Sequence, residues 1–276
     1  MTAPALVMLS HGSTEHRVTE VTHRLRVGLQ SLRPELEVNA AFIDSCPPTG
    51  PQVVSQLVAR GVEEIVFVPL HITSAIAHHV AIDEIVDRVR STHPSTRFAV
   101  ARPIGPEPRL LSVLDLRLRA ALASGHATEL DALVLSAEGP ADVRGAALLA
   151  RRARQWGAHH RLPCVTALSD EPGAGVSQAI ASLRDQGRRH IAVGSFYLTG
   201  DQFFEAQARQ ALRHSAIAVS GPIGVDDVVL DAVLARYCFA AMDLLDFDID
   251  LAVAQPPEGS VLKTADQADL AFAAAF

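Results

Sequence analysis

Residues 5–13 read Ala-Leu-Val-Met-Leu-Ser-His-Gly-Ser, an apolar run that ends in a histidine and two small residues. Such a short, continuous apolar run predicts a strand buried on both faces, as in a parallel sheet. Residues 65–70, Ile-Val-Phe-Val-Pro-Leu, predict a second strand, and the segment after it leads to His79. Because the carboxyl ends of parallel strands line one crevice, we expect His11 and His79 to face one site, an arrangement suited to a divalent metal.

Strands and helices alternate through the first half of the chain. The apolar runs predict strands at 5–10, 37–43, 63–70 and 97–101, and the segments between and after them predict helices at 14–31, 50–60, 80–91 and 108–122. This order predicts an α/β fold, an open parallel sheet with helices on both faces.

The second half of the chain repeats the first. Residues 6–12 align with 133–139 at an offset of 127, and Pro103-Ile104-Gly105 aligns with Pro222-Ile223-Gly224 at an offset of 119. Two tandem, internally repeated parallel-sheet lobes are therefore expected. The predicted division is a first lobe at 1–122, a linker at 123–130, a second lobe at 131–245 and a tail at 246–276 that packs on a lobe.

Composition narrows the class of protein. The chain has 276 residues, enough for two cores, and its net charge of −7, without runs of basic residues, argues against nucleic-acid binding. It lacks the roughly 18 consecutive apolar residues of a membrane span, and its amino terminus does not look like a secretion signal, so a cytoplasmic protein is expected. Three separated cysteines, Cys46, Cys164 and Cys238, fit a reducing compartment.

His11 has two interpretations, a structural histidine or a ligand-binding one. Its position after a buried strand, followed by the small residues Gly12 and Ser13, favours a binding role, since ligands bind at this edge of an open sheet. A histidine phosphatase motif would need an arginine where this chain has Ser10, so that class is excluded.

Four short motifs occur in order over the first 111 residues, at 9–13, 41–44, 74–83 and 101–111. Together they resemble the class II chelatases, the family of sirohydrochlorin ferrochelatases and cobaltochelatases, which insert Fe2+ or Co2+ into a modified tetrapyrrole. The resemblance implies a two-lobe chelatase fold in which His11 and His79 are catalytic and bind the metal. Asp44 stands where the family usually has glutamate, so it is either a third metal ligand or the cap of a turn.

The motif at 74–83 leaves the choice between His78 and His79 open. The family pattern has glycine at the position of Ile76 and one residue fewer before its histidine. His79 is favoured because Val80 and Asp83 then keep the family's register. Asp83, one turn later, is expected to orient the ring of His79.

The tetrapyrrole is expected to contact residues at the same strand ends. Those predicted to bind it are Ser10, Gly12, Ser13, His71 and Arg102, with Arg17 and Arg109 as further partners for its carboxylates. The second lobe has Glu138 and Glu205 at the repeat positions of His11 and His79, so we expect a degenerate lobe that closes the cleft without binding metal. His159, His160 and His190 are expected in surface turns without a catalytic role.

The predicted function is insertion of Fe2+ into sirohydrochlorin, giving sirohaem. In the predicted mechanism the two histidines capture the metal and one of them removes protons from the ring. Cobalt insertion into sirohydrochlorin or a related precorrin is the alternative, and a non-catalytic metal or tetrapyrrole carrier is an alternative of another class. The metal is a substrate, no organic cofactor is expected, and a monomer that binds neither nucleic acid nor membrane is expected because two lobes are fused.

Overall fold

The structure, a computed structural model, describes residues 3–73, 76–139, 143–169 and 174–254. It contains two four-stranded parallel sheets, which confirms the predicted α/β class and its two lobes. The first sheet has the order β2-β1-β3-β4, formed by β1 (Ala5–Ser10), β2 (Val38–Phe42), β3 (Glu64–Pro69) and β4 (Arg97–Val100). The second has the order β6-β5-β7-β8, formed by β5 (Ala132–Glu138), β6 (Cys164–Ser169), β7 (Ile191–Ser195) and β8 (Ala218–Val219).

The strand order creates a crevice at one end of each sheet. β1 pairs with β2 on one side and with β3 on the other. The strand order therefore reverses at β1, because β2 lies on one side of it while β3 and β4 lie on the other. β5 has the same position between β6 and β7. Ligands of open α/β sheets bind outside the carboxyl ends of the strands at such a switch point. The fold therefore offers one binding edge in each lobe.

Helices cover both faces of the first sheet. One face carries α1 (His16–Leu32) and α8 (Asp227–Ala254), and the other carries α2 (Gly50–Ala59) and α3 (Ile76–Thr92). α1 forms because its apolar residues recur at helical spacing, and it buries Val18, Leu25 and Leu29 against the sheet. α2 begins with a capping box in which Thr49 and Gln52 satisfy each other's backbone N–H groups.

The second sheet is covered in the same way. α4 (Leu110–Ser124) and α5 (Val143–His160) lie on one face, while α6 (Ala174–Asp185) and α7 (Gln202–Arg213) lie on the other. Trp156 of α5 is 2% exposed, and its indole lies against Gly194 of β7, where a Cβ would be only 2.4 Å from the ring. Glycine at this position therefore lets the largest buried side chain of the lobe lie flat on the sheet.

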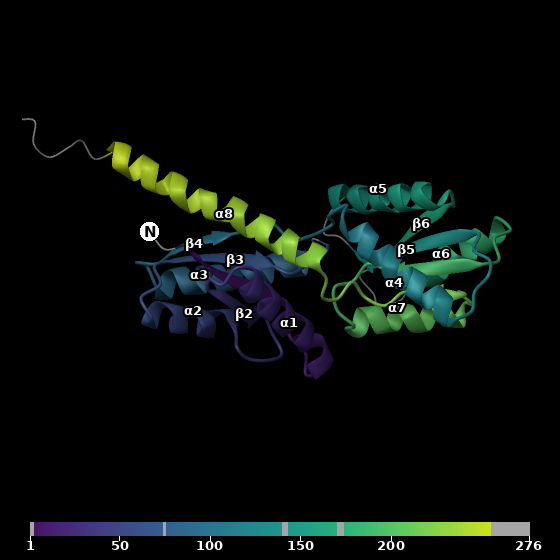
Figure 1. Ribbon diagram of the computed structural model, residues 1–276, viewed down its shortest axis with the longest axis horizontal. Helices are drawn as coiled ribbons and strands as arrows, with labels where there is room; N and C mark the ends of the chain where they lie inside the picture. Colours follow the sequence, from purple (N-terminus) through teal and green to yellow (C-terminus); the bar gives the residue numbers. More distant parts are fainter. Residues whose placement is uncertain (1–2, 74–75, 140–142, 170–173, 255–276) are drawn as a thin grey trace, which may run out of the picture.

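The two lobes exchange their last helices, which differs from the predicted division at 122. α4 was expected to complete the first lobe, but it packs on β7 and β8 of the second sheet. α8 follows the second sheet in the chain and packs on β3 and β4 of the first (Figure 1). The predicted boundary at 245 also falls inside α8, which continues to Ala254, and the expected tail from 255 onward lies outside the described residues.

Two strand-to-helix connections therefore join the lobes, and arginines bind across them. Arg152 of α5 donates to the carbonyl of Pro106 at 2.9 Å, and Arg236 of α8 donates to the carbonyl of Pro103 at 2.9 Å. Arg117 of α4 binds the carbonyl of Ile223 at 3.2 Å. One apolar core runs through this region, from the α1 and α8 side of the first sheet to the α4 and α5 side of the second. Within the described parts of the chain, no helix combines the length and apolarity needed to cross a membrane.

Candidate functional site

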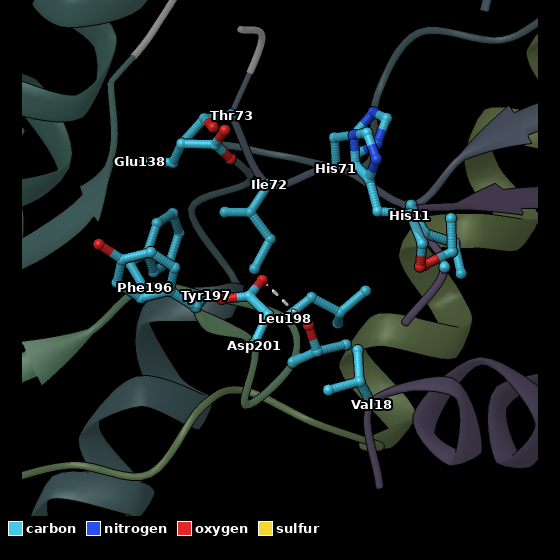
Figure 2. A pocket seen from close by; sticks show the side chains of 14 residues that line it. His11, Val18, His71, Ile72, Thr73, Glu138, Phe196, Tyr197, Leu198 and Asp201 are labelled. Carbon is cyan, nitrogen blue, oxygen red and sulfur yellow. Dashed lines mark hydrogen bonds between the residues drawn. The ribbon is translucent and has the colours of Figure 1, made fainter. Parts of the chain in front are cut away.

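A pocket lies between the lobes, where the carboxyl ends of β1 and β3 face those of β5 and β7 (Figure 2). The first lobe contributes residues that directly follow its two central strands, including His11 and His71. The second lobe contributes Glu138, Tyr197 and Asp201. Imidazoles therefore line one side of this pocket and carboxylates the other, and the pocket is located at the switch points of both sheets.

His11 and Asp44 form the edge of this site. The Nδ1 atom of His11 lies 3.2 Å from Oδ2 of Asp44, and the backbone N–H of Gly12 donates to Oδ1 of Asp44 at 2.9 Å. The side chains of His11 and Asp44 are 38% and 52% exposed, while Nε2 of His11 is buried. Asp44 does not line the pocket itself. The pair is therefore partly exposed, and of its two residues His11 lines the pocket.

Gly12 is required by the close approach of the two loops. A Cβ at this position would lie 2.0 Å from the carbonyl oxygen of Asp44 and 2.9 Å from Sγ of Cys46. The absence of a side chain lets the loop after β1 touch the loop after β2, and this contact positions the Asp44 carboxylate beside His11.

His71 is the second imidazole of the pocket. It follows β3 directly, is 7% exposed, and its ring centroid lies 5.2 Å from that of His11 with an angle of 39° between the ring planes. Figure 2 shows the two rings next to each other on one side of the pocket. The structure therefore brings His71 to His11, in line with its predicted position at the crevice.

The structure brings together only some of the predicted tetrapyrrole contacts. Ser10 and Gly12 line the pocket, but Ser13 and Arg102 do not. Ser13 accepts a hydrogen bond from the backbone N–H of Glu15 at 3.0 Å, and Arg102 is exposed. Arg109 is also exposed and pairs with Asp231 of α8 at 2.9 Å.

The His78–His79 pair lies in the first turn of α3. The sequence predicts a helix from residue 80, whereas α3 begins at Ile76. Both histidines are therefore on a helical backbone, but their side chains lie outside the described residues. The roles of His79 as metal ligand and catalytic residue remain predictions.

The second lobe gives the pocket an acidic wall. Burial raises the pKa of Tyr197 to about 12, and the charges of Asp201 and Glu138 add to this rise. Burial also raises the pKa of Asp201, which caps α7 by accepting the backbone N–H of Phe204 at 3.0 Å. Glu138 ends β5 at the repeat position of His11 and lies across the pocket from it (Figure 2).

The position of Tyr197 at the pocket could have been predicted from the internal repeat, but the sequence analysis did not single out this residue. Residues 196–199, Phe-Tyr-Leu-Thr, follow β7 as residues 70–73, Leu-His-Ile-Thr, follow β3. Tyr197 is thus the repeat partner of His71, and both line the pocket. An alignment of the two copies extended to this segment would have found it.

Glu205, the repeat position of His79, is part of a contact between the lobes. Its carboxylate pairs with Arg17 of α1, and Arg17 also binds Glu15 at 2.8 Å. Val18, which follows Arg17, and Asp201, one helical turn before Glu205, line the pocket. The pair therefore holds α1 against α7 near the pocket, and in this conformation the guanidinium of Arg17 is occupied by protein carboxylates.

Two parallel-sheet lobes that meet at a histidine-lined pocket define a two-lobe α/β protein with its candidate site between the lobes. Residues 5–121 match the model of the CbiX family. The match covers less than half of the chain, from β1 into α4, and this part of the chain is similar to that family.

A sirohydrochlorin cobaltochelatase from Priestia megaterium is 27% identical over 82 residues, a stretch that spans 30% of this chain and 27% of that relative. The fold is similar to the crystal structure of the sirohydrochlorin chelatase SirB from Bacillus subtilis subspecies spizizenii in complex with cobalt. The TM-score is 0.71 at 17% identity, over 87% of this chain and 96% of that one.

A second solved structure has the same fold. It is CbiX, described as the terminal enzyme for biosynthesis of siroheme in denitrifying bacteria. The TM-score is 0.58 at 18% identity, over 84% of this chain and 98% of that one.

Proposed function

We propose that this protein inserts Fe2+ into sirohydrochlorin and produces sirohaem. The observation that carries the proposal is the His11–Asp44 pair at the edge of a pocket between two lobes, beside a second imidazole, His71. The CbiX relative linked to siroheme biosynthesis supports iron. The cobaltochelatase of Priestia megaterium supports Co2+ insertion as the second candidate, and imidazole and carboxylate ligands accept both metals.

The metal would first bind His11 and Asp44, with His79 as a further ligand. Two ligand atoms on one tetrahedral metal, each about 2.0–2.2 Å from it, lie roughly 3.4 Å apart. The 3.2 Å between Nδ1 of His11 and Oδ2 of Asp44 fits this spacing. Both side chains are partly exposed, so the metal would keep some of its water and remain loosely held. Loose binding is needed because the protein must release the metal to the ring.

Insertion requires that two pyrrole N–H groups lose their protons as bonds form from the ring nitrogens to the metal. The reaction balances as M2+ plus the free-base ring giving the metallated ring plus two protons. A neutral imidazole accepts protons near neutral pH, so one of the cleft histidines serves as the acceptor and passes the protons to solvent. Ser10, Gly12 and His71 would contact the macrocycle, because they line the pocket next to His11.

The carboxylates of the substrate need cationic partners at the rim of the pocket. All three candidate arginines are exposed. Arg17 is next to Val18, which lines the pocket, whereas Arg102 follows β4 and Arg109 precedes α4. A substrate carboxylate would compete with Glu205 for the guanidinium of Arg17. We also propose that the chain acts as a cytoplasmic monomer, since its own two lobes form the pocket, and light scattering of the purified protein tests the monomer.

The test is metal insertion by His11→Ala. The absorbance of free-base sirohydrochlorin is followed after addition of Fe2+ or Co2+ under anaerobic conditions. We expect His11→Ala to lose insertion while its thermal stability stays close to wild type, because the His11 side chain is partly exposed. His214→Ala, which changes an exposed histidine of the second lobe, is the control and should retain activity.

The same assay separates an enzyme from a carrier. A carrier would bind the metal and the tetrapyrrole, but the metallated ring would form no faster than it does without protein. Full insertion activity in His11→Ala would contradict the proposed site. Comparison of the two metals at equal concentration decides between iron and cobalt as the preferred substrate.

A further inference from the structure

A second group of metal-ligating side chains lies in the second lobe, outside the pocket. His159 and His160 end α5, and Asp115 lies on α4. One ligand atom from each residue can be chosen so that all three lie within 4.8 Å of one another. None of the three lines the pocket between the lobes. The two histidines were expected in surface turns, but they form the last turn of a helix.

Two of the three side chains, His160 and Asp115, are held in place before any metal binds. Nε2 of His160 lies 2.5 Å from Oδ1 of Asp115, and the rings of His159 and His160 are 5.1 Å apart at 85°. The ring of His160 meets the buried indole of Trp156 edge-on, with centroids 5.8 Å apart. Arg119 binds the other oxygen of Asp115 at 2.7 Å. His160 and Asp115 would therefore lose little side-chain freedom when a metal binds.

The chemistry of this group suits a borderline divalent cation. Two imidazoles and one carboxylate are a common ligand set for Zn2+, Co2+ and Fe2+, with the remaining positions open to water. Burial alone would raise the pKa of Asp115, but its hydrogen bonds and charge interactions with His160 and Arg119 lower it. The lowered pKa of Asp115 favours the ionised carboxylate, which is the form that binds a metal. The carbonyl groups at the end of α5 add negative potential, while the charge of Arg119 opposes the cation.

We propose that Asp115, His159 and His160 form a second divalent-metal site that joins α4 to α5. The metal would bind Nε2 of His160 and the carboxylate of Asp115 in place of their hydrogen bond, the proton of that hydrogen bond would be released to solvent, and His159 would become the third ligand. α4 is one of the two exchanged helices, so a metal here would fasten it to the second lobe. The site is separate from the proposed reaction and does not depend on it.

Substitution of His159 distinguishes a metal site from a simple ion pair between His160 and Asp115. A pair between His160 and Asp115 does not need His159, which is exposed and lies against the ring of His160. A three-ligand metal site does need it. His159→Ala therefore tests the proposal with little risk to folding. His214→Ala, in an exposed position of the same lobe, is the matched control.

The experiment measures bound Co2+ by equilibrium dialysis in a His11→Ala, Asp44→Ala, His79→Ala background, which removes the three proposed cleft ligands. We expect this background protein and its His214→Ala derivative to bind one equivalent of Co2+. The His159→Ala derivative should lose it, with an at least tenfold weaker affinity. Zn2+ should raise the Tm of the background protein and leave that of the His159→Ala derivative nearly unchanged, because only a native state that binds the ion is stabilised.

Two outcomes would overturn the proposal. The background protein would bind no Co2+, or its His159→Ala derivative would bind as much as its parent. Failure of the proposed insertion activity has a different readout, since it would leave wild-type protein inactive with free-base sirohydrochlorin whatever the dialysis result. The Co2+ absorption spectrum adds a check, since four-coordinate Co2+ with imidazole ligands absorbs visible light much more strongly, and at longer wavelength, than the octahedral hexaaqua ion.

Discussion

The imidazole of His11 and the carboxylate of Asp44 face each other at the ends of β1 and β2, with Nδ1 3.2 Å from Oδ2. The backbone N–H of Gly12 holds the second carboxylate oxygen at 2.9 Å. One oxygen of Asp44 is therefore fixed by the protein backbone and the other is directed at the imidazole. This division lets Asp44 orient His11 in the metal-free protein and share the metal with it when metal is present.

Substitution of Asp44 tests this arrangement. Asp44→Asn keeps the shape of the side chain but removes its charge, so we expect Co2+ affinity to fall roughly 10–100-fold, the range seen when the partner of a metal-binding histidine is lost. Asp44→Glu keeps the charge and should retain most of the affinity. Titration calorimetry with Co2+ measures both variants. Equal affinities for wild type and Asp44→Asn would show that the carboxylate does not act on the metal.

Gly12→Ala should weaken both the metal site and the fold. The new Cβ would lie 2.0 Å from the carbonyl oxygen of Asp44, so the two loops must move apart. Overpacking of this kind costs about 1–3 kcal/mol of stability, and the movement also carries the Asp44 carboxylate away from His11. Chemical denaturation and Co2+ titration report the two effects. Gly221→Ala is the control, since a Cβ there has no heavy atom within 4 Å.

Only one of the two neighbouring histidines of α3 should be needed for insertion, and we expect it to be His79. Consecutive residues on a helix point about 100° apart, and α3 begins at Ile76, before both of them. Two such side chains cannot easily reach one metal beside His11. Insertion rates and Co2+ affinities of His78→Ala and His79→Ala separate the cases. Loss in His78→Ala alone would mean that the assigned register is off by one residue.

The sequence predicts the sheets well because their signal is local. The strands of the first half are found within about two residues of their predicted ends, since continuous apolar runs mark strands buried on both faces. The position of His71 at the pocket follows from the same logic, because the residue after a parallel strand emerges at the binding edge. The start of α3 is harder to predict, since His78 and His79 interrupt the apolar pattern of its first turn.

The sequence does not reveal which sheet a helix covers. α4 and α8 each have an apolar face, but nothing in that face identifies the first or the second sheet as its partner. Their exchange follows from long-range packing, in which α8 buries its apolar residues on β3 and β4. The contact of His160 with Asp115 is hidden for the same reason, because it depends on where α4 packs.

The exchange of helices can be tested by cutting the chain at two different places. A chain of residues 1–122 has every segment that the sequence assigns to the first lobe, but it lacks α8. The large side chains that α8 buries include these four: Leu230, Val233, Tyr237 and Leu244. At about 1.5–3 kcal/mol each, an upper estimate, their loss removes roughly 6–12 kcal/mol. This is as much as the whole stability of a typical domain, about 5–15 kcal/mol.

We therefore expect residues 1–122 to be insoluble or to lack a cooperative unfolding transition. A second chain, in which residues 1–109 are joined by a flexible Gly/Ser linker to residues 227–254, should fold, because it restores α8 to β3 and β4 and the hydrogen bond from the Tyr237 hydroxyl to the carbonyl of Pro4 at 2.7 Å. Circular dichroism and thermal unfolding compare the two. If the 1–122 chain folded as stably as the joined chain, α8 would not be needed to complete the first lobe, and the division at residue 122 would be restored.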